Sequence, residues 1–126
     1  MRNIIFRGKR LDNGEWMYGD LLQYDDGSVC IGVHSKNYTD DGFNSGQYRR
    51  IALVDEDTVG QYTGLQDKNG KKIFEGDILS DGAFTYEVRY KGTGFVTILD
   101  GYVYTMDTRP TKIVIGNIHD HPDLLK

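Results

Sequence analysis

Glycine follows asparagine or aspartate at six places in this chain of 126 residues, and these dipeptides limit what the chain can fold into. Asn, Asp and Gly tolerate positive φ, so such pairs favour the tight turns of β-hairpins. Helical periodicity is scarce by comparison. We therefore expect a mainly β meander, and the length favours a single domain over residues 1–126. Five of the dipeptides are Asn13-Gly14, Asp26-Gly27, Asp41-Gly42, Asn69-Gly70 and Asp100-Gly101, and the sixth is Asp81-Gly82.

Between these turns the hydrophobic pattern has a period of two. In residues 86–91, YEVRYK, the side chains of Tyr86, Val88 and Tyr90 fall on one face of a strand and the charged ones on the other. Residues 112–118 form a more continuous apolar run, which predicts a central strand. Further strands are expected at 4–7, 15–23, 28–34, 48–54 and 102–106, single helical turns at 54–59 and 122–125, and a long polar loop at 35–47.

Charge and cysteine content exclude several classes of protein. The formal net charge is −4, whereas a strongly basic nucleic-acid binder would show the reverse. The single cysteine, Cys30, allows no intrachain disulfide, which fits a reducing compartment. The longest apolar run, residues 51–54, is far too short to cross a bilayer, and the first residues lack the apolar core of a signal peptide. We expect a cytoplasmic protein with no membrane partner.

The segment 60–79, GQYTGLQDKNGKKIFEGDIL, concentrates glycines and carboxylates. Residues 67–70 are predicted to form a turn, 72–74 a strand, and 75–77 a bend that redirects it. Glu75 and Asp77 would share a face on a regular strand and could then hold a metal ion or divide acid and base roles. Gly76 interrupts that regularity, so a role in shaping the backbone is favoured. Tyr62, Glu75 and Asp77 are the candidate binding residues, and no catalytic residue is predicted.

The histidine cluster at 119–123, HDHPD, is the other candidate for metal chemistry. His119 and His121 could face one metal ion, with Asp120, Asp123 or the distant His34 as a third ligand. The pair lies near the C-terminus beside a proline, so solvated side chains in a terminal turn are favoured. No metal and no cofactor are predicted.

Basic residues alternate with aromatic ones at three places: 6–10, 48–50 and 71–74. On a small β-barrel such residues could hold single-stranded nucleic acid by stacking and phosphate contact. With a net charge of −4, charge scattered over the surface is the favoured interpretation.

Three parts of the chain carry a family resemblance: residues 6–9 with 13–21, the block from Val59 to Leu79, and the closing residues 115–125, IGNIHDHPDLL. Together they resemble the YopX family of small phage and prophage proteins. The resemblance implies a mainly β pseudo-barrel with a short helical cap, in agreement with the period-two pattern. It also implies a bacterial cytoplasm during phage growth or lysogeny. It supplies no catalytic residues.

Three functions follow as hypotheses. The leading one is a non-enzymatic accessory module that binds an unknown host or phage protein, or itself, because tyrosine is abundant and suits interfaces. The second is nucleic-acid binding through the basic and aromatic patches. The third is a metal-dependent hydrolase that uses Glu75, Asp77 or the His119 and His121 pair.

Overall fold

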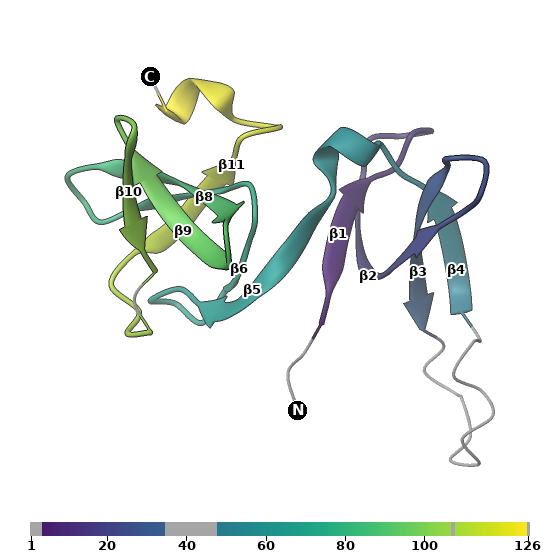
Figure 1. Ribbon diagram of the computed structural model, residues 1–126, viewed down its shortest axis with the longest axis horizontal. Helices are drawn as coiled ribbons and strands as arrows, with labels where there is room; N and C mark the ends of the chain where they lie inside the picture. The colour runs from purple at the N-terminus through teal and green to yellow at the C-terminus, as the bar shows by residue number, and fades with distance from the viewer. Residues whose placement is uncertain (1–3, 35–47, 107, 126) are drawn as a thin grey trace, which may run out of the picture. The chain divides into compact units, whose positions relative to one another are not determined.

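The structure is a computed structural model that describes residues 4–34, 48–106 and 108–125 (Figure 1). The chain divides into two compact units, Ile4–Gly60 and Gln61–Lys126, and each is described by itself. Both consist mainly of antiparallel strands, which confirms the predicted mainly β class. The long loop expected at 35–47 lies outside the described residues. That the whole chain is one domain stays a prediction.

The Ile4–Gly60 unit contains four antiparallel strands in the order β4-β3-β2-β1. Two of the predicted turns connect them, and Gly14 and Gly27 have φ of +73° and +89° there. Met17, Val29, Ile31 and Val54 form the buried core. The strands are β1 (Phe6–Lys9), β2 (Trp16–Gln23), β3 (Val29–His34) and β4 (Tyr48–Leu53), followed by the 3-10 turn η1 (Glu56–Thr58).

Two glycines allow β2 and β3 to lie unusually close together. A Cβ atom on Gly19 would lie 2.1 Å from the carbonyl oxygen of Gly32, a distance that no side chain can occupy. A Cβ atom on Gly32 would lie 2.8 Å from the ring of Tyr48, which covers that glycine from β4. The absence of side chains at these two positions therefore sets the local packing of the sheet.

The helical turn predicted at 54–59 is η1, and its cap explains why it forms. The Asp55 side chain accepts a hydrogen bond from the backbone N–H of Asp57 at 3.0 Å. The buried Thr58 hydroxyl donates to the carbonyl of Asp55 at 2.6 Å and accepts from the N–H of Lys9 at 2.9 Å. The turn is thereby joined to β1.

The Gln61–Lys126 unit contains a hairpin and a five-stranded sheet of order β10-β9-β8-β7-β11. The hairpin pairs β5 (Gly60–Gln66) with β6 (Lys72–Phe74). Ile73 of the hairpin packs with Leu79 and Val88 of the sheet to form the core. The sheet strands are β7 (Asp77–Ser80), β8 (Thr85–Lys91), β9 (Gly94–Leu99), β10 (Tyr102–Thr105) and β11 (Ile113–Asn117), and the 3-10 turn η2 (Pro122–Leu125) follows.

Glu75 and Gly76 form the predicted bend between β6 and β7. Gly76 has φ of +93°, a conformation that favours glycine. Its N–H donates to the carbonyl of Val88 and its carbonyl accepts from Ile118, both at 2.9 Å. The bend therefore leads the chain out of the β5–β6 hairpin and into the five-stranded sheet.

Two expectations need correction. The closed pseudo-barrel is not formed by the described strands, because the sheet ends at β10 on one side and at β11 on the other. For the same reason the continuous apolar run at 112–118 is an end strand and not a central one. The run is apolar because other parts of the unit cover it. The backbone N–H of Val114 donates to the buried Asp67 carboxylate, and Gly116 packs against His121 and Leu124. The expected helical cap corresponds to the single turn η2.

None of the helical segments in the described part of the chain has the length and apolar character needed to cross a membrane.

Candidate functional site

Tyr62, one of the three candidate binding residues, is buried in the hairpin of β5 and β6. Its ring lies opposite Phe74, with the ring centroids 5.6 Å apart. The Lys72 ammonium lies 5.8 Å from the centre of the Tyr62 ring. Only a small part of the Tyr62 side chain is therefore available to a ligand.

Glu75 and Asp77, the other two candidates, occupy different environments. Asp77 is 2% exposed, and its Oδ2 atom accepts a hydrogen bond from the N–H of Phe74 at 2.7 Å. Glu75 is half-buried at the bend, where its own N–H donates to the carbonyl of Gln61 at 2.9 Å. The Asp77 carboxylate thus closes the bend by binding its backbone. Whether the two residues also take part in binding stays a prediction.

Asp67 is a second buried carboxylate in the same block, and it accepts three backbone hydrogen bonds. It is 3% exposed, yet it accepts N–H groups from Asn69 and Lys71 at 2.8 Å and from Val114 at 2.9 Å. Burial by itself raises the pKa of the Asp67 carboxyl, but the three N–H groups outweigh it and hold the pKa below its ordinary value of 3.8. Asp67 therefore fixes the 67–71 turn against β11.

The histidine pair lies in the turn that joins β11 to η2. The Nδ1 atom of His121 accepts the N–H of Asn117 at 3.2 Å, and the Asn117 side-chain oxygen accepts the N–H groups of His119 and Asp120. Gly116 lies under the His121 ring. His121 thus packs η2 onto β11. In residues 4–34, 48–106 and 108–125, no three His, Cys, Asp or Glu side chains are grouped to hold a metal ion.

Two of the three basic and aromatic patches, at 6–10 and 71–74, do not present their aromatic rings and cations together at the surface. Arg7 is buried with its guanidinium 4.7 Å from the centre of the Trp16 ring, and Phe74 is buried in the core. Arg10 forms an ion pair with Asp12 at 2.6 Å. These residues hold strands together and leave few exposed rings on which bases could stack.

Tertiary structure also brings together a cluster that the sequence did not indicate. The Oδ2 atom of Asp20 lies 2.7 Å from Nε2 of His34 and 2.9 Å from the hydroxyl of Tyr48. The Asp20 carboxylate raises the pKa of the Tyr48 phenol, because it accepts the phenol's hydrogen bond and repels the phenolate. The cluster is exposed at one edge of the sheet, and only the pairing of β2, β3 and β4 brings its members within reach.

Another arrangement that the sequence did not reveal is a row of aromatic side chains on one face of the five-stranded sheet. Residues opposite each other in paired strands share a face, and the register pairs Tyr90 with Phe95, and Thr97 with both Val88 and Tyr104. Leu99 is paired with Tyr102 on the same face. We call this surface the tyrosine face; its aromatic members are Tyr86, Tyr90, Phe95, Tyr102 and Tyr104.

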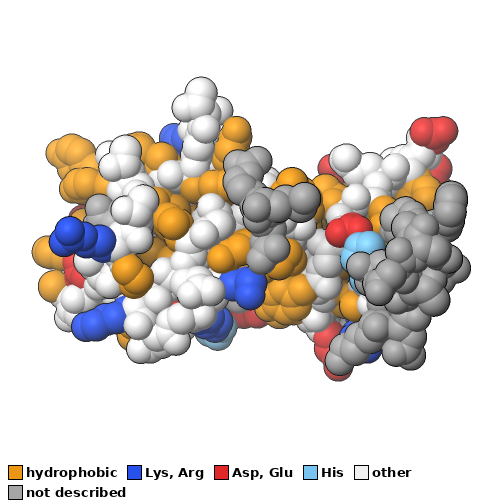
Figure 2. Space-filling view, turned by 90° about the horizontal axis from the view of Figure 1, so that it is seen from below, with side chains coloured by type: hydrophobic (Ala, Val, Ile, Leu, Met, Phe, Trp, Pro, Cys, Tyr) orange, Lys and Arg blue, Asp and Glu red, His pale blue; other side chains and the backbone are white. Residues whose placement is uncertain are grey.

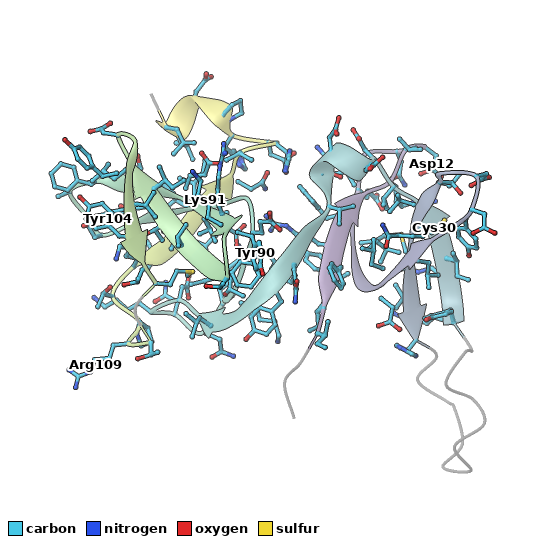
Figure 3. The ribbon with its side chains drawn as sticks, viewed as in Figure 1. Asp12, Cys30, Tyr90, Lys91, Tyr104 and Arg109 are labelled. Carbon is cyan, nitrogen blue, oxygen red and sulfur yellow. The ribbon has the colours of Figure 1, made fainter. Side chains whose placement is uncertain are left out.

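The tyrosine face is exposed at the end of the sheet that carries β10. Tyr90, Tyr102 and Tyr104 are 53%, 70% and 47% exposed. Figure 3 labels Tyr90 on β8 and Tyr104 on β10. Figure 2 shows hydrophobic side chains, in orange, at the surface of the left end of the view, where β10 lies in Figure 1. Toward β7 the same face is covered by Ile73 and Met106.

Contacts between neighbours hold several of these rings in place. Tyr86 and Tyr104 meet edge to face with their centroids 6.3 Å apart, and Tyr90 meets Phe95 in the same way at 5.1 Å. The Tyr86 hydroxyl donates to Asp81 at 2.7 Å, and the Lys112 ammonium lies 4.8 Å from the Tyr86 ring centre. These contacts therefore hold most rings of the tyrosine face in place.

A small hollow opens beside these rings, within the same unit. Its volume is about 20 Å³, which is enough for one or two water molecules. Thr97 and Met106 line it, and the exposed Arg109 lies at its border. Ligand pockets for small molecules are many times larger, so this hollow suits a single side chain or water and not a metabolite.

A signal for the tyrosine face was present in the sequence. Tyr86 and Tyr90 were placed on one face by alternation, and Tyr102 and Tyr104 alternate in the same manner after the Asp100-Gly101 turn. The strand between them, β9, was not predicted, so the register that unites the two pairs was missing. Only that register shows that the four tyrosines share a face.

Comparison with known proteins decides the family. The sequence profile described as "YopX protein" matches residues 5–126, nearly the whole chain. The chain belongs to the YopX family. Protein EF1440 from Enterococcus faecalis, known from a crystal structure, is similar over 100% of both chains, with 25% sequence identity and a TM-score of 0.58. None of the curated proteins matches this chain.

The family assignment confirms the resemblance drawn from residues 6–21, the block from Val59 to Leu79 and residues 115–125. The likeness to EF1440 adds that a crystal structure shares the fold over the full length of this YopX-family chain. Neither the family description nor the name of EF1440 states an activity, so the two comparisons assign none.

Proposed function

We propose that this YopX-family chain acts as a protein-binding module and that the tyrosine face is its binding surface. The observation that carries the proposal is that Tyr90, Tyr102 and Tyr104 are each about half exposed or more on one face of one sheet. Tyrosine combines a large apolar ring with a polar tip, and it is enriched at the centres of protein interfaces.

The surroundings of these tyrosines support a contact with a macromolecule. Met106, a residue type that is also enriched in interfaces, packs with Tyr86 against the same core cluster. The small hollow that Met106 and Thr97 line has room for water or a single side chain and not for a metabolite. Because contacts with Tyr86 and Phe95 already hold Tyr104 and Tyr90, binding would order few side chains and so lose little conformational entropy.

Nucleic acid is a weaker candidate for the same face. Stacking of bases on tyrosine would need cations nearby to neutralise phosphates. Arg89 on β8 belongs to the opposite face and pairs with Glu87, while Lys112 lies against Tyr86. The YopX resemblance implies a phage or prophage origin, so we expect the partner among phage and bacterial host proteins.

The test compares capture of proteins by three forms of the chain. A variant with Tyr90→Ser, Tyr102→Ser and Tyr104→Ser removes the exposed rings, and Tyr24→Ser removes a ring of similar exposure in the other unit as a matched control. Each form is immobilised and incubated with lysate from phage-infected bacteria, and retained proteins are identified by mass spectrometry. We expect a protein that the wild type and Tyr24→Ser retain and the triple variant loses.

Equal retention by all three forms would overturn the proposal. A titration with short single-stranded and duplex oligonucleotides at two salt concentrations tests the alternative, that the tyrosine face binds nucleic acid. Binding that weakens steeply with salt and vanishes in the triple variant would assign the face to nucleic acid instead. Circular dichroism of the triple variant must match the wild type for either comparison to count.

A further inference from the structure

β10 is an end strand of the five-stranded sheet, and it lacks the features that normally protect such an edge. All four residues of Tyr102–Thr105 are exposed, and none of them is charged or proline. Natural sheets protect exposed edges with charged side chains, prolines, bulges or covering segments, because a bare edge pairs readily with another strand. β10 is therefore prepared to accept a strand.

The other end strands described here are protected. β4 carries Arg49 and Arg50, two adjacent cations that would meet any approaching strand. β11 has a register irregularity between Val114 and Gly116, and the N–H of Val114 is taken by the Asp67 side chain. β6 is only three residues long, begins with the charged Lys72, and its other two residues are buried. The difference singles out β10.

The turn before β10 determines which of its backbone groups point outward. Asp100 and Gly101 have φ of 51° and 83°, as in a two-residue hairpin turn of type I′. In such a hairpin the pair that flanks the turn, Leu99 and Tyr102, exchanges hydrogen bonds, and pairs along the ladder alternate. Tyr104 therefore also bonds to β9, whereas Val103 and Thr105 direct their N–H and C=O groups away from the sheet.

We propose that two copies of this chain pair through β10, antiparallel and about a twofold axis, with Val103 opposite Val103 of the second copy. The inference rests on the proposed function, since it extends the tyrosine face across the junction. Directly opposite residues share a face, so this register places Tyr102 opposite Tyr104 of the second copy, ring beside ring. A register centred on Tyr104 would instead place a non-hydrogen-bonded pair on the axis and set Val103 opposite Thr105, so the cross-linking test below must distinguish the two registers.

A second copy fits this edge in both charge and hydrogen bonding. In a twofold pairing each side chain near the axis meets its own type, so any charge there would be repelled by itself. β10 carries none, and Asp100, three residues before Val103, falls opposite Met106 of the second copy. The two Val103 residues exchange two hydrogen bonds. Each Thr105 lies opposite Gly101 of the other copy, which has no side chain to obstruct the pairing.

The first test removes an outward N–H group and leaves the fold intact. Val103→Pro deletes the donor at the centre of the junction but no ladder bond to β9, and proline is tolerated at such an edge position. Val103→Thr keeps the N–H and a β-branched side chain as the matched control. In sedimentation equilibrium we expect a dimer for the wild type and Val103→Thr. For Val103→Pro we expect a dimer dissociation constant that is about tenfold higher or more.

The second test maps the register by disulfide trapping. Residues opposite each other in a hydrogen-bonded antiparallel pair have Cα atoms about 5.5 Å apart, within the range that a disulfide spans. Val103→Cys should therefore cross-link to its copy under mild oxidation. Thr105→Cys, on the same strand and face, would be about 13 Å from its copy and should not. The unmodified chain, which contains the buried Cys30, serves as the control for cross-linking through that cysteine.

A wild-type chain that sediments as a monomer at all concentrations, or equal cross-linking of the two cysteine variants, would overturn the inference. Either result leaves the capture experiment with the tyrosine variants to be judged separately, because Val103 lies on the opposite face from the tyrosines. Loss of partner capture with an intact dimer would overturn the proposed function alone. If Val103→Pro fails to fold, the cysteine pair still decides the register.

Discussion

The two compact units hold their strands together by opposite means. In Ile4–Gly60 the strands approach because side chains are missing, as at Gly19, whose neighbour is a backbone oxygen. In Gln61–Lys126 buried carboxylates reach across gaps and bind backbone N–H groups, as Asp67 does for Val114. The comparison teaches that the buried acidic residues of the second unit, which at first suggest catalysis or metal binding, fix the positions of strands. The glycines have that structural role in the first unit.

The largest expected effect comes from removing the buried carboxylate. Asp67→Ala leaves three N–H groups without their acceptor, so we expect a loss of about 3–5 kcal/mol in the free energy of unfolding. Urea titration followed by circular dichroism measures it.

Asp81→Ala is the matched control for that loss. Asp81 also accepts three hydrogen bonds, from the N–H groups of Ala83 and Phe84 and the hydroxyl of Tyr86, but it is exposed at the β7–β8 turn. Water can replace those bonds, so the loss must be clearly smaller. Equal losses from the two variants would contradict the view that burial makes Asp67 important.

The second effect probes the glycine packing of the first unit. A methyl group at position 19 would collide with the Gly32 carbonyl, so Gly19→Ala should cost about 2–3 kcal/mol. Gly94→Ala in β9 is the control, because nothing lies within 4 Å of its Cβ position. We expect Gly94→Ala to change stability by less than about 1 kcal/mol, or to raise it slightly. A tolerated Gly19→Ala would mean that the two strands can separate at little cost.

The third prediction concerns acid. The pKa of Asp67 is lower in the folded chain than its ordinary value of 3.8. The ionised carboxylate therefore stabilises the fold fully above that ordinary pKa, and its contribution disappears as the pH falls through the lowered folded-state pKa. The difference in unfolding free energy between wild type and Asp67→Asn should be constant at neutral pH and shrink below about pH 4. A difference that stays constant down to about pH 2 would exclude this role of the charge.

The smallest effect is expected at the exposed cluster of the first unit. Tyr48→Phe removes the hydrogen bond to Asp20 but keeps the ring that covers Gly32. Because solvent can satisfy the Asp20 carboxylate, the unfolding free energy should change by only about 0.5 kcal/mol. A loss as large as that of Asp67→Ala would show that the cluster is more than a surface contact.

Much of the fold was readable from local pattern. The turns at Asn13-Gly14, Asp26-Gly27, Asn69-Gly70 and Asp100-Gly101, the bend at Gly76 and both helical turns were predicted and are present. Alternation located most strands within one or two residues. Sheet closure was not readable, because it depends on which strands pair at the ends, and hydrophobic pattern does not encode that choice.

The candidate sites also differ in whether local sequence could reveal them. Local sequence identified Glu75 and Asp77 as a pair worth attention, but it gave no hint that Asp67 is bonded to Val114, which lies 47 residues along the chain. The cluster of Asp20, His34 and Tyr48 likewise depends on strand pairing. Long-range contacts of this kind have no local signature.

Turn chemistry, strand period and family membership were therefore determined by the amino-acid sequence, because φ preferences and alternation act over a few neighbouring residues. Tertiary structure alone decided that β11 ends the sheet, that the four tyrosines share one face, and that β10 is left uncovered. Those outcomes depend on register, and register is set by the summed packing and hydrogen bonding of strands far apart in the chain.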